Sequence, residues 1–141
     1  MRELKLRAYI KDLEDYGRVI SLLFGNKDEV ESALVEVMYS NGSIERLDVP
    51  KENLILEQYT GLIDKNGTEI YEGDIVQIDS IDELRVGYVD LLYDQYCIVC
   101  GEDDEGRKIV AEFYYYSKPE ENCKVIGNIH EDKELLERSE E

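Results

Sequence analysis

Apolar and polar side chains alternate along most of the chain with a period of two. In the first segment Leu4, Leu6, Ala8 and Ile10 form one set, and the positions between them hold Lys5, Arg7 and Tyr9. Alternation of this kind predicts a β-strand with one buried face. Further strand-like runs lie at 18–24, 35–39, 44–49, 54–59, 86–93, 95–99, 109–116 and 124–129. About eight short strands separated by turns predict an all-β (mainly β) barrel or sandwich rather than a βαβ fold.

Turn-forming residues separate these strands. Asn41-Gly42 and Asn66-Gly67 each predict a tight hairpin turn in which both residues adopt positive φ. Segment 29–40 leaves two alternatives open. Its start is compatible with a helical turn, while its second half alternates like a strand.

A domain boundary is expected at residues 50–53. Pro50 has no N–H with which to continue a ladder, so it ends the strand before it. We expect residues 1–50 to form an N-terminal β subdomain and residues 51–130 to form a β-barrel. Residues 131–141 are expected to form an acidic C-terminal tail with at most a short terminal helix, whose Leu135 and Leu136 dock back.

The chain is strongly acidic. It carries 34 Asp and Glu residues against 16 Lys and Arg residues, a net charge of −18. Binding to phosphate backbones or to anionic membranes requires excess positive charge, so this balance argues against both as direct partners. An acidic surface suits a basic protein partner, or it keeps the chain soluble. The basic residues that could contact phosphate cluster at the N-terminus: Arg2, Lys5, Arg7 and Lys11.

Targeting signals are not expected in this sequence. The N-terminus has charges at alternating positions and no apolar core, unlike a signal peptide. No run approaches the roughly 18 apolar residues of a membrane span, and three cysteines are too few for a disulfide framework. The Asn-Gly-Ser/Thr motifs at 41–43 and 66–68 are then turns rather than glycosylation sites. We expect a cytoplasmic protein.

Residues 64–68 begin like a calcium-binding loop, with oxygen-bearing side chains at alternate positions. Such a loop requires glycine at its sixth position and a bidentate glutamate at its twelfth. The chain has Glu69 and Ile75 at these positions, so a calcium site is not expected. Asp64 is instead expected to bond the turn backbone. The segment that follows should place Ile70, Ile75 and Val76 in the core.

Four residues could act as zinc ligands: Cys97, Cys100, Cys123 and His130. However, Cys97 and Cys100 lie in a segment with a strand pattern, where residues three apart face opposite sides of the sheet. A zinc knuckle needs a turn there, and the intervening residues are β-branched. No metal site is therefore expected, and the thiols are read as buried or edge groups.

No catalytic or cofactor-binding residue is expected. His130 is the single histidine, so a nucleophile–base pair would have to include it. Ser117 and Cys123 are the nearest nucleophiles, and neither lies in a recognisable catalytic motif. The aromatic run 113–116 could stack bases only beside a basic groove. Its flanks are acidic, so it is expected in the core or at a subunit interface.

The central block resembles the signature of the YopX family. It reads QYTGL at 58–62, DKNG at 64–67 and EIYEGDIV at 69–76, and two further matches are MRELKLRA at 1–8 and VIGNIHE at 125–131. The sequence departs from the family pattern at Tyr9, commonly Trp, and at Asp132-Lys133, usually Asn-Pro. The resemblance implies a phage or prophage product whose C-terminal part is an SH3-like barrel. It supplies no activity and no catalytic residues.

Three functions follow as hypotheses. The leading one is a non-catalytic phage-encoded accessory protein of uncharacterised function that acts through protein–protein contacts as a homo-oligomer, because a tyrosine-rich β domain has strand edges that need cover. The alternative is an acidic decoy that imitates nucleic acid and binds a basic host or phage protein. The third is a nucleic-acid accessory factor, which the charge disfavours.

Overall fold

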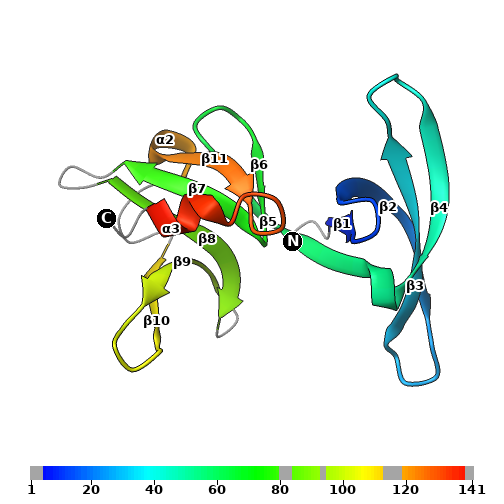
Figure 1. The fold of residues 1–141 in the computed structure, drawn as a ribbon, viewed down its shortest axis with the longest axis horizontal. Coiled ribbons are helices and arrows are strands. Elements are labelled where there is room, and N and C mark those ends of the chain that lie inside the picture. The colour runs from blue at the N-terminus through cyan, green and yellow to red at the C-terminus, as the bar shows by residue number, and fades with distance from the viewer. Residues whose placement is uncertain (1–4, 80–83, 93–94, 113–118, 139–141) are drawn as a thin grey trace. The chain divides into compact units, whose positions relative to one another are not determined.

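The computed structural model describes residues 5–79, 84–92, 95–112 and 119–138. These residues form antiparallel strands and a few short helical segments, which confirms the all-β prediction (Figure 1). The chain divides into two compact units, called here the N-terminal unit (Leu4–Gln58) and the C-terminal unit (Tyr59–Glu141 with Met1–Glu3). The division falls inside a strand, whereas Pro50 lies at the end of an earlier strand within the N-terminal unit.

The N-terminal unit contains one sheet with the strand order β4-β3-β2-β1-β5. Its elements are β1 (Leu6–Ile10), β2 (Asp15–Phe24), β3 (Val30–Met38), β4 (Ile44–Pro50), the 3-10 turn η1 (Lys51–Asn53) and the first half of β5 (Leu54–Ile63). Of the two alternatives for segment 29–40, the strand is the one observed. One face of this sheet, called here the core face, is covered by apolar side chains and buries Ala8, Ile10, Ala33, Val35, Val37 and Val49.

The C-terminal unit begins with the second half of β5, which pairs with β6 (Glu69–Tyr71). A second sheet has the order β10-β9-β8-β7-β11. Its strands are β7 (Asp74–Asp79), β8 (Leu84–Leu92), β9 (Gln95–Glu102), β10 (Lys108–Glu112) and β11 (Cys123–Asn128). Four consecutive strands form a meander, and the last strand returns beside the first. The short helices are α2 (Pro119–Asn122) and α3 (Glu134–Arg138).

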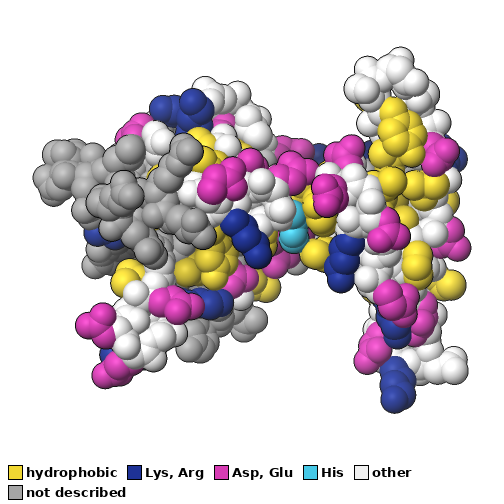
Figure 2. All heavy atoms as spheres, in the orientation of Figure 1, with side chains coloured by type: hydrophobic (Ala, Val, Ile, Leu, Met, Phe, Trp, Pro, Cys, Tyr) yellow, Lys and Arg dark blue, Asp and Glu magenta, His cyan; other side chains and the backbone are white. Residues whose placement is uncertain are grey.

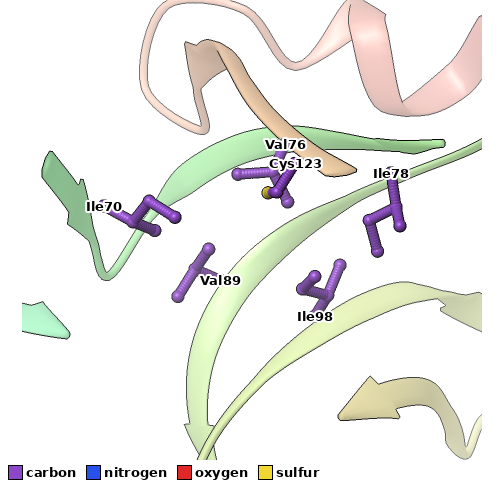
Figure 3. Packing of buried hydrophobic residues seen from close by; sticks show 6 residues of the cluster. All are labelled: Ile70, Val76, Ile78, Val89, Ile98 and Cys123. Atoms are coloured by element: carbon purple, nitrogen blue, oxygen red, sulfur yellow. The ribbon is translucent and has the colours of Figure 1, made fainter. Parts of the chain in front are cut away.

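The core of the C-terminal unit is built from β6, β7, β8, β9 and β11. Six side chains form it: Ile70, Val76, Ile78, Val89, Ile98 and Cys123 (Figure 3). Ile70, Ile75 and Val76 are fully buried, as the sequence pattern predicts. The Cys123 thiol therefore serves as a small apolar side chain in this core.

Four hairpin turns share one backbone design, which corrects the two-residue turns predicted from the sequence. They span 25–29, 39–43, 64–68 and 103–107, and in each the first N–H donates to the fifth carbonyl while the fourth N–H donates to the first carbonyl. The fourth residue has positive φ: Asp28, Gly42, Gly67 and Gly106. Asn41 and Asn66 do not adopt positive φ, because the loop has three residues and needs a left-handed residue at one position only.

Candidate interaction surface

The face of the N-terminal sheet opposite the core face, called here the outer face, carries a row of charges across five strands. The charge row consists of Glu57, Arg7, Arg18, Glu36 and Arg46, and each is the direct cross-strand partner of the next. Arg7 Nε lies 2.9 Å from Glu57 Oε1, and both Arg18 and Arg46 lie 3.3 Å from Glu36. Opposite charges on facing strands stabilise a sheet, as in the pairs of β1 with β5, β2 with β3 and β3 with β4. Arg7 and Arg18, which face each other on β1 and β2, are like charges.

One end of the charge row is held firmly. The buried Glu57 carboxylate accepts hydrogen bonds from Arg7 Nε and from the Tyr16 hydroxyl, both at 2.9 Å. The Arg7 guanidinium also lies 4.2 Å from the centre of the Tyr16 ring, within cation–π range. The other end is open to solvent, since the Arg18 and Arg46 side chains are 67% and 63% exposed. The outer face thus presents two solvent-exposed guanidinium groups, each ion-paired with Glu36.

A second row, two residues along each strand, is apolar. It consists of Ile55, Tyr9, Tyr16, Met38 and Ile44, the first three joined by the pairings of β1 with β5 and β2. Tyr9 is buried, with its ring 5.1 Å from that of Tyr16 in an edge-to-face contact. Met38 and Ile44 are 68% and 56% exposed. These two residues face each other on β3 and β4 and place exposed apolar side chains next to the charge row. Figure 2 shows hydrophobic side chains among the charged ones over these strands.

The two rows were not found from the sequence, because they depend on the register of five strands. The sequence predicted a phosphate-contacting cluster of Arg2, Lys5, Arg7 and Lys11. Arg7 is engaged by Glu57 and Tyr16, Lys11 lies in the exposed turn after β1, and Arg2 lies outside the described residues. The sequence shows only that Arg18, Glu36 and Arg46 occupy polar positions of alternating segments. It does not show that they face one another.

The DKNG segment at 64–67 forms a hairpin turn that is hydrogen-bonded to β11. Oδ1 of the buried Asp64 accepts the N–H groups of Asn66 at 2.8 Å and Thr68 at 2.9 Å, as predicted for a turn. Its Oδ2 accepts the N–H of Val125 at 2.9 Å, from β11. Lys65 N–H adds a second bond to β11, at the Cys123 carbonyl. One side chain therefore closes the turn and attaches it to a strand 61 residues away.

A family model described as YopX protein matches residues 5–137 of the chain. The chain belongs to the YopX family. Two solved structures share its fold. Protein EF1440 from Enterococcus faecalis is 24% identical, with a TM-score of 0.59 over 96% of this chain and 99% of that one. Protein yopX from Bacillus subtilis is 17% identical, with a TM-score of 0.58 over 96% and 98%. No curated protein matches the sequence.

The four zinc-ligand candidates of this YopX-family chain lie on different parts of the C-terminal unit. Cys97 and Cys100 are three residues apart on β9, and β8 and β7 separate that strand from Cys123 on β11. His130 follows β11 in a turn. Within the described ranges, no group of three or more His, Cys, Asp and Glu side chains is arranged to hold a metal ion. Burial, followed by the charges of Asp64 and Asp74, raises the pKa of Cys123 to about 12.

Of the two nucleophile candidates, Cys123 lies within the described residues. A Cys123 thiol with this pKa stays protonated at neutral pH and is a poor nucleophile. Ser117 and the aromatic run 113–116 lie outside the described residues. A surface hollow of about 280 Å³ in the C-terminal unit is lined by Tyr88, Val99, Cys100, Gly101, Glu102 and Leu136. Among the described residues, no helix is long and apolar enough to cross a membrane.

Proposed function

We propose that this YopX-family chain is a non-catalytic accessory protein of phage or prophage origin, which acts through protein–protein contacts and assembles with copies of itself. The observation that carries the proposal is the open end of the outer face. There the exposed pair of Met38 and Ile44 lies two residues along β3 and β4 from the pair of Glu36 and Arg46. The Arg18 and Arg46 side chains are exposed as well. Methionine, aromatic residues and arginine are the types enriched at protein interfaces.

The composition of the outer face differs from that of the chain as a whole. The charge row holds three arginines and two glutamates, whereas the whole chain carries a net charge of −18. Exposed apolar side chains and exposed cations lie on the same face at its open end. Association with a surface that offers acidic and apolar groups, including another part of the same chain, would cover both.

Light scattering of the full chain at micromolar concentration tests the proposal. We expect an oligomer that Ile44→Asp weakens, because this change puts a charge at the exposed end of the apolar row. Ile109→Asp is the matched control, since Ile109 is similarly exposed at 47% but lies on β10 of the C-terminal unit. A wild-type chain that stays monomeric would contradict self-assembly. Equal effects of the two variants would remove the outer face from the proposal.

A further inference from the structure

The edge strands in the described part of the chain differ in length and in the regularity of their pairing. Proteins protect free edges with short strands and with bulges. Edge strand β6 has three residues, and its pairing with β5 shifts register. The pairings of β10 with β9 and of β11 with β7 also shift register. By contrast, β4 runs for seven residues and pairs with β3 position by position without a shift. It is a long, regular edge.

The turn before β4 determines which backbone groups lie on its free side. Tyr39 N–H donates to the Ser43 carbonyl at 2.8 Å, so residues 39 and 43 form a hydrogen-bonded pair. Hydrogen-bonded and non-hydrogen-bonded pairs alternate along an antiparallel ladder. Residues 45, 47 and 49 therefore bond to β3. The N–H and carbonyl groups of Ile44, Arg46 and Asp48 point away from β3, and their side chains lie on the outer face.

We propose that this edge pairs with β4 of a second copy of the chain, in antiparallel orientation about a twofold axis at Leu47. Symmetric pairing through the free backbone groups allows few registers. An axis at Glu45, Arg46 or Asp48 places that residue opposite itself, with like charges adjacent. An axis at Leu47 places Arg46 opposite Asp48 of the second copy, and by symmetry Asp48 opposite Arg46. Only this register is complementary in charge.

The remaining positions agree with the Leu47 axis. Leu47, which packs against the core of the N-terminal unit, meets Leu47 of the second copy on the core face. Ile44 lies opposite Pro50 of the second copy, whose missing N–H ends the pairing. The charge row then continues from Arg46 into Asp48 of the second copy. Charges on an edge strand usually prevent association, but here they permit one register and oppose its neighbours.

This inference rests on the self-assembly proposed above, and sedimentation velocity of the full chain tests it separately. Asp48→Arg sets arginine opposite arginine at two symmetric positions, so we expect the dissociation constant to rise about tenfold or more. Adding Arg46→Asp to that variant restores two opposite-charge pairs between the copies and should recover part of the affinity, since the change also removes the ion pair of Arg46 with Glu36. Arg107→Asp is the control, because Arg107 is an exposed, ion-paired arginine in the turn between β9 and β10.

A backbone variant provides a second, independent test. Arg46→Pro removes an N–H that faces the free edge and leaves the bonds of β4 to β3 in place, a position where strands tolerate proline. We expect a folded monomer, with a far-ultraviolet circular dichroism spectrum like that of the wild type. Oligomers that survive both Arg46→Pro and Asp48→Arg would overturn β4 pairing while leaving self-assembly intact. A monomeric wild type would overturn both proposals.

Discussion

Two aspartates in matching turns show how much one extra contact changes the role of a residue. Asp64 and Asp103 both open a five-residue turn, and in both Oδ1 accepts the N–H groups two and four residues later. Oδ2 of Asp103 bonds Arg107 in the same exposed turn, whereas Oδ2 of Asp64 bonds Val125 on β11. Asp103 therefore shapes only its own hairpin. Asp64 also joins distant segments of the C-terminal unit.

Replacing each aspartate by asparagine separates these roles. In Asp64→Asn the amide can still accept the turn N–H groups, but its NH₂ group then faces the Val125 N–H. A buried donor without an acceptor costs about 1–3 kcal/mol, so we expect a loss of that size in the free energy of unfolding. Asp103→Asn should be much less destabilising, since its turn is exposed. Urea denaturation of both variants measures the difference, and equal losses would contradict the role of Asp64 in joining the turn to β11.

The same aspartate predicts a pH dependence. Burial raises the pKa of Asp64, but the N–H groups of Val125, Thr68 and Asn66 outweigh it and lower the pKa below its usual value of 3.8. A group with a lowered folded-state pKa stabilises the fold above its unfolded-state pKa, and this contribution is lost as pH falls through the folded-state value. The stability advantage of wild type over Asp64→Asn should therefore be full at pH 6 and shrink below about pH 4. Unfolding followed by fluorescence across this range tests it.

Local patterns predicted Asp64 only in part. The carboxylate two residues before Asn-Gly indicated a turn, and the positions of Glu69 and Ile75 argued against a calcium site. The bond to Val125 could not be predicted, because it depends on where β11 returns in the sheet. The positive φ predicted for Asn41 and Asn66 was wrong, since a two-residue and a three-residue loop share the Asn-Gly signal.

At the scale of strands, the two rows of the outer face depend on pairing register. Alternation predicted the strands, and burial of Ala8 and Ile10 on one face of β1 agrees with it. Alternation does not say which residues of neighbouring strands face each other. The pairing of β2 with β3 shifts twice, and such shifts change every later partner. The candidate interaction surface therefore could not be predicted from the sequence, although alternation placed most of its residues in strands.

Tyr16 provides a test of that register. Its hydroxyl, on β2, reaches across β1 to the buried Glu57 on β5, so it links strands that are not neighbours. Tyr16→Phe removes a hydrogen bond to a charged group and should cost about 1–2 kcal/mol. Tyr39→Phe is the control, because the Tyr39 hydroxyl donates to Glu45 at an exposed position. Thermal unfolding of both should show a loss at Tyr16 alone; similar losses would count against the buried link.

At the scale of the whole molecule, net charge opposes the assembly proposed for the outer face and β4. Two copies of a chain with a net charge of −18 repel each other at long range. That repulsion is felt across about 30 Å in 10 mM salt and about 8 Å in 150 mM salt. Complementary pairs at an interface lie close together and are screened less. Self-association and capture of a basic partner therefore respond to salt in opposite directions.

This opposition distinguishes the two leading functions. If the chain assembles with itself, raising NaCl from about 10 to 150 mM should strengthen the oligomer, because screening removes more repulsion between copies than attraction across β4. If it is instead an acidic decoy for a basic host or phage protein, that complex should weaken over the same range, since opposite net charges supply its affinity. Sedimentation velocity at several salt concentrations measures the first effect, and a pull-down from host lysate at matched salt measures the second. An oligomer that dissociates on adding salt would show instead that attraction across the interface outweighs the repulsion between net charges.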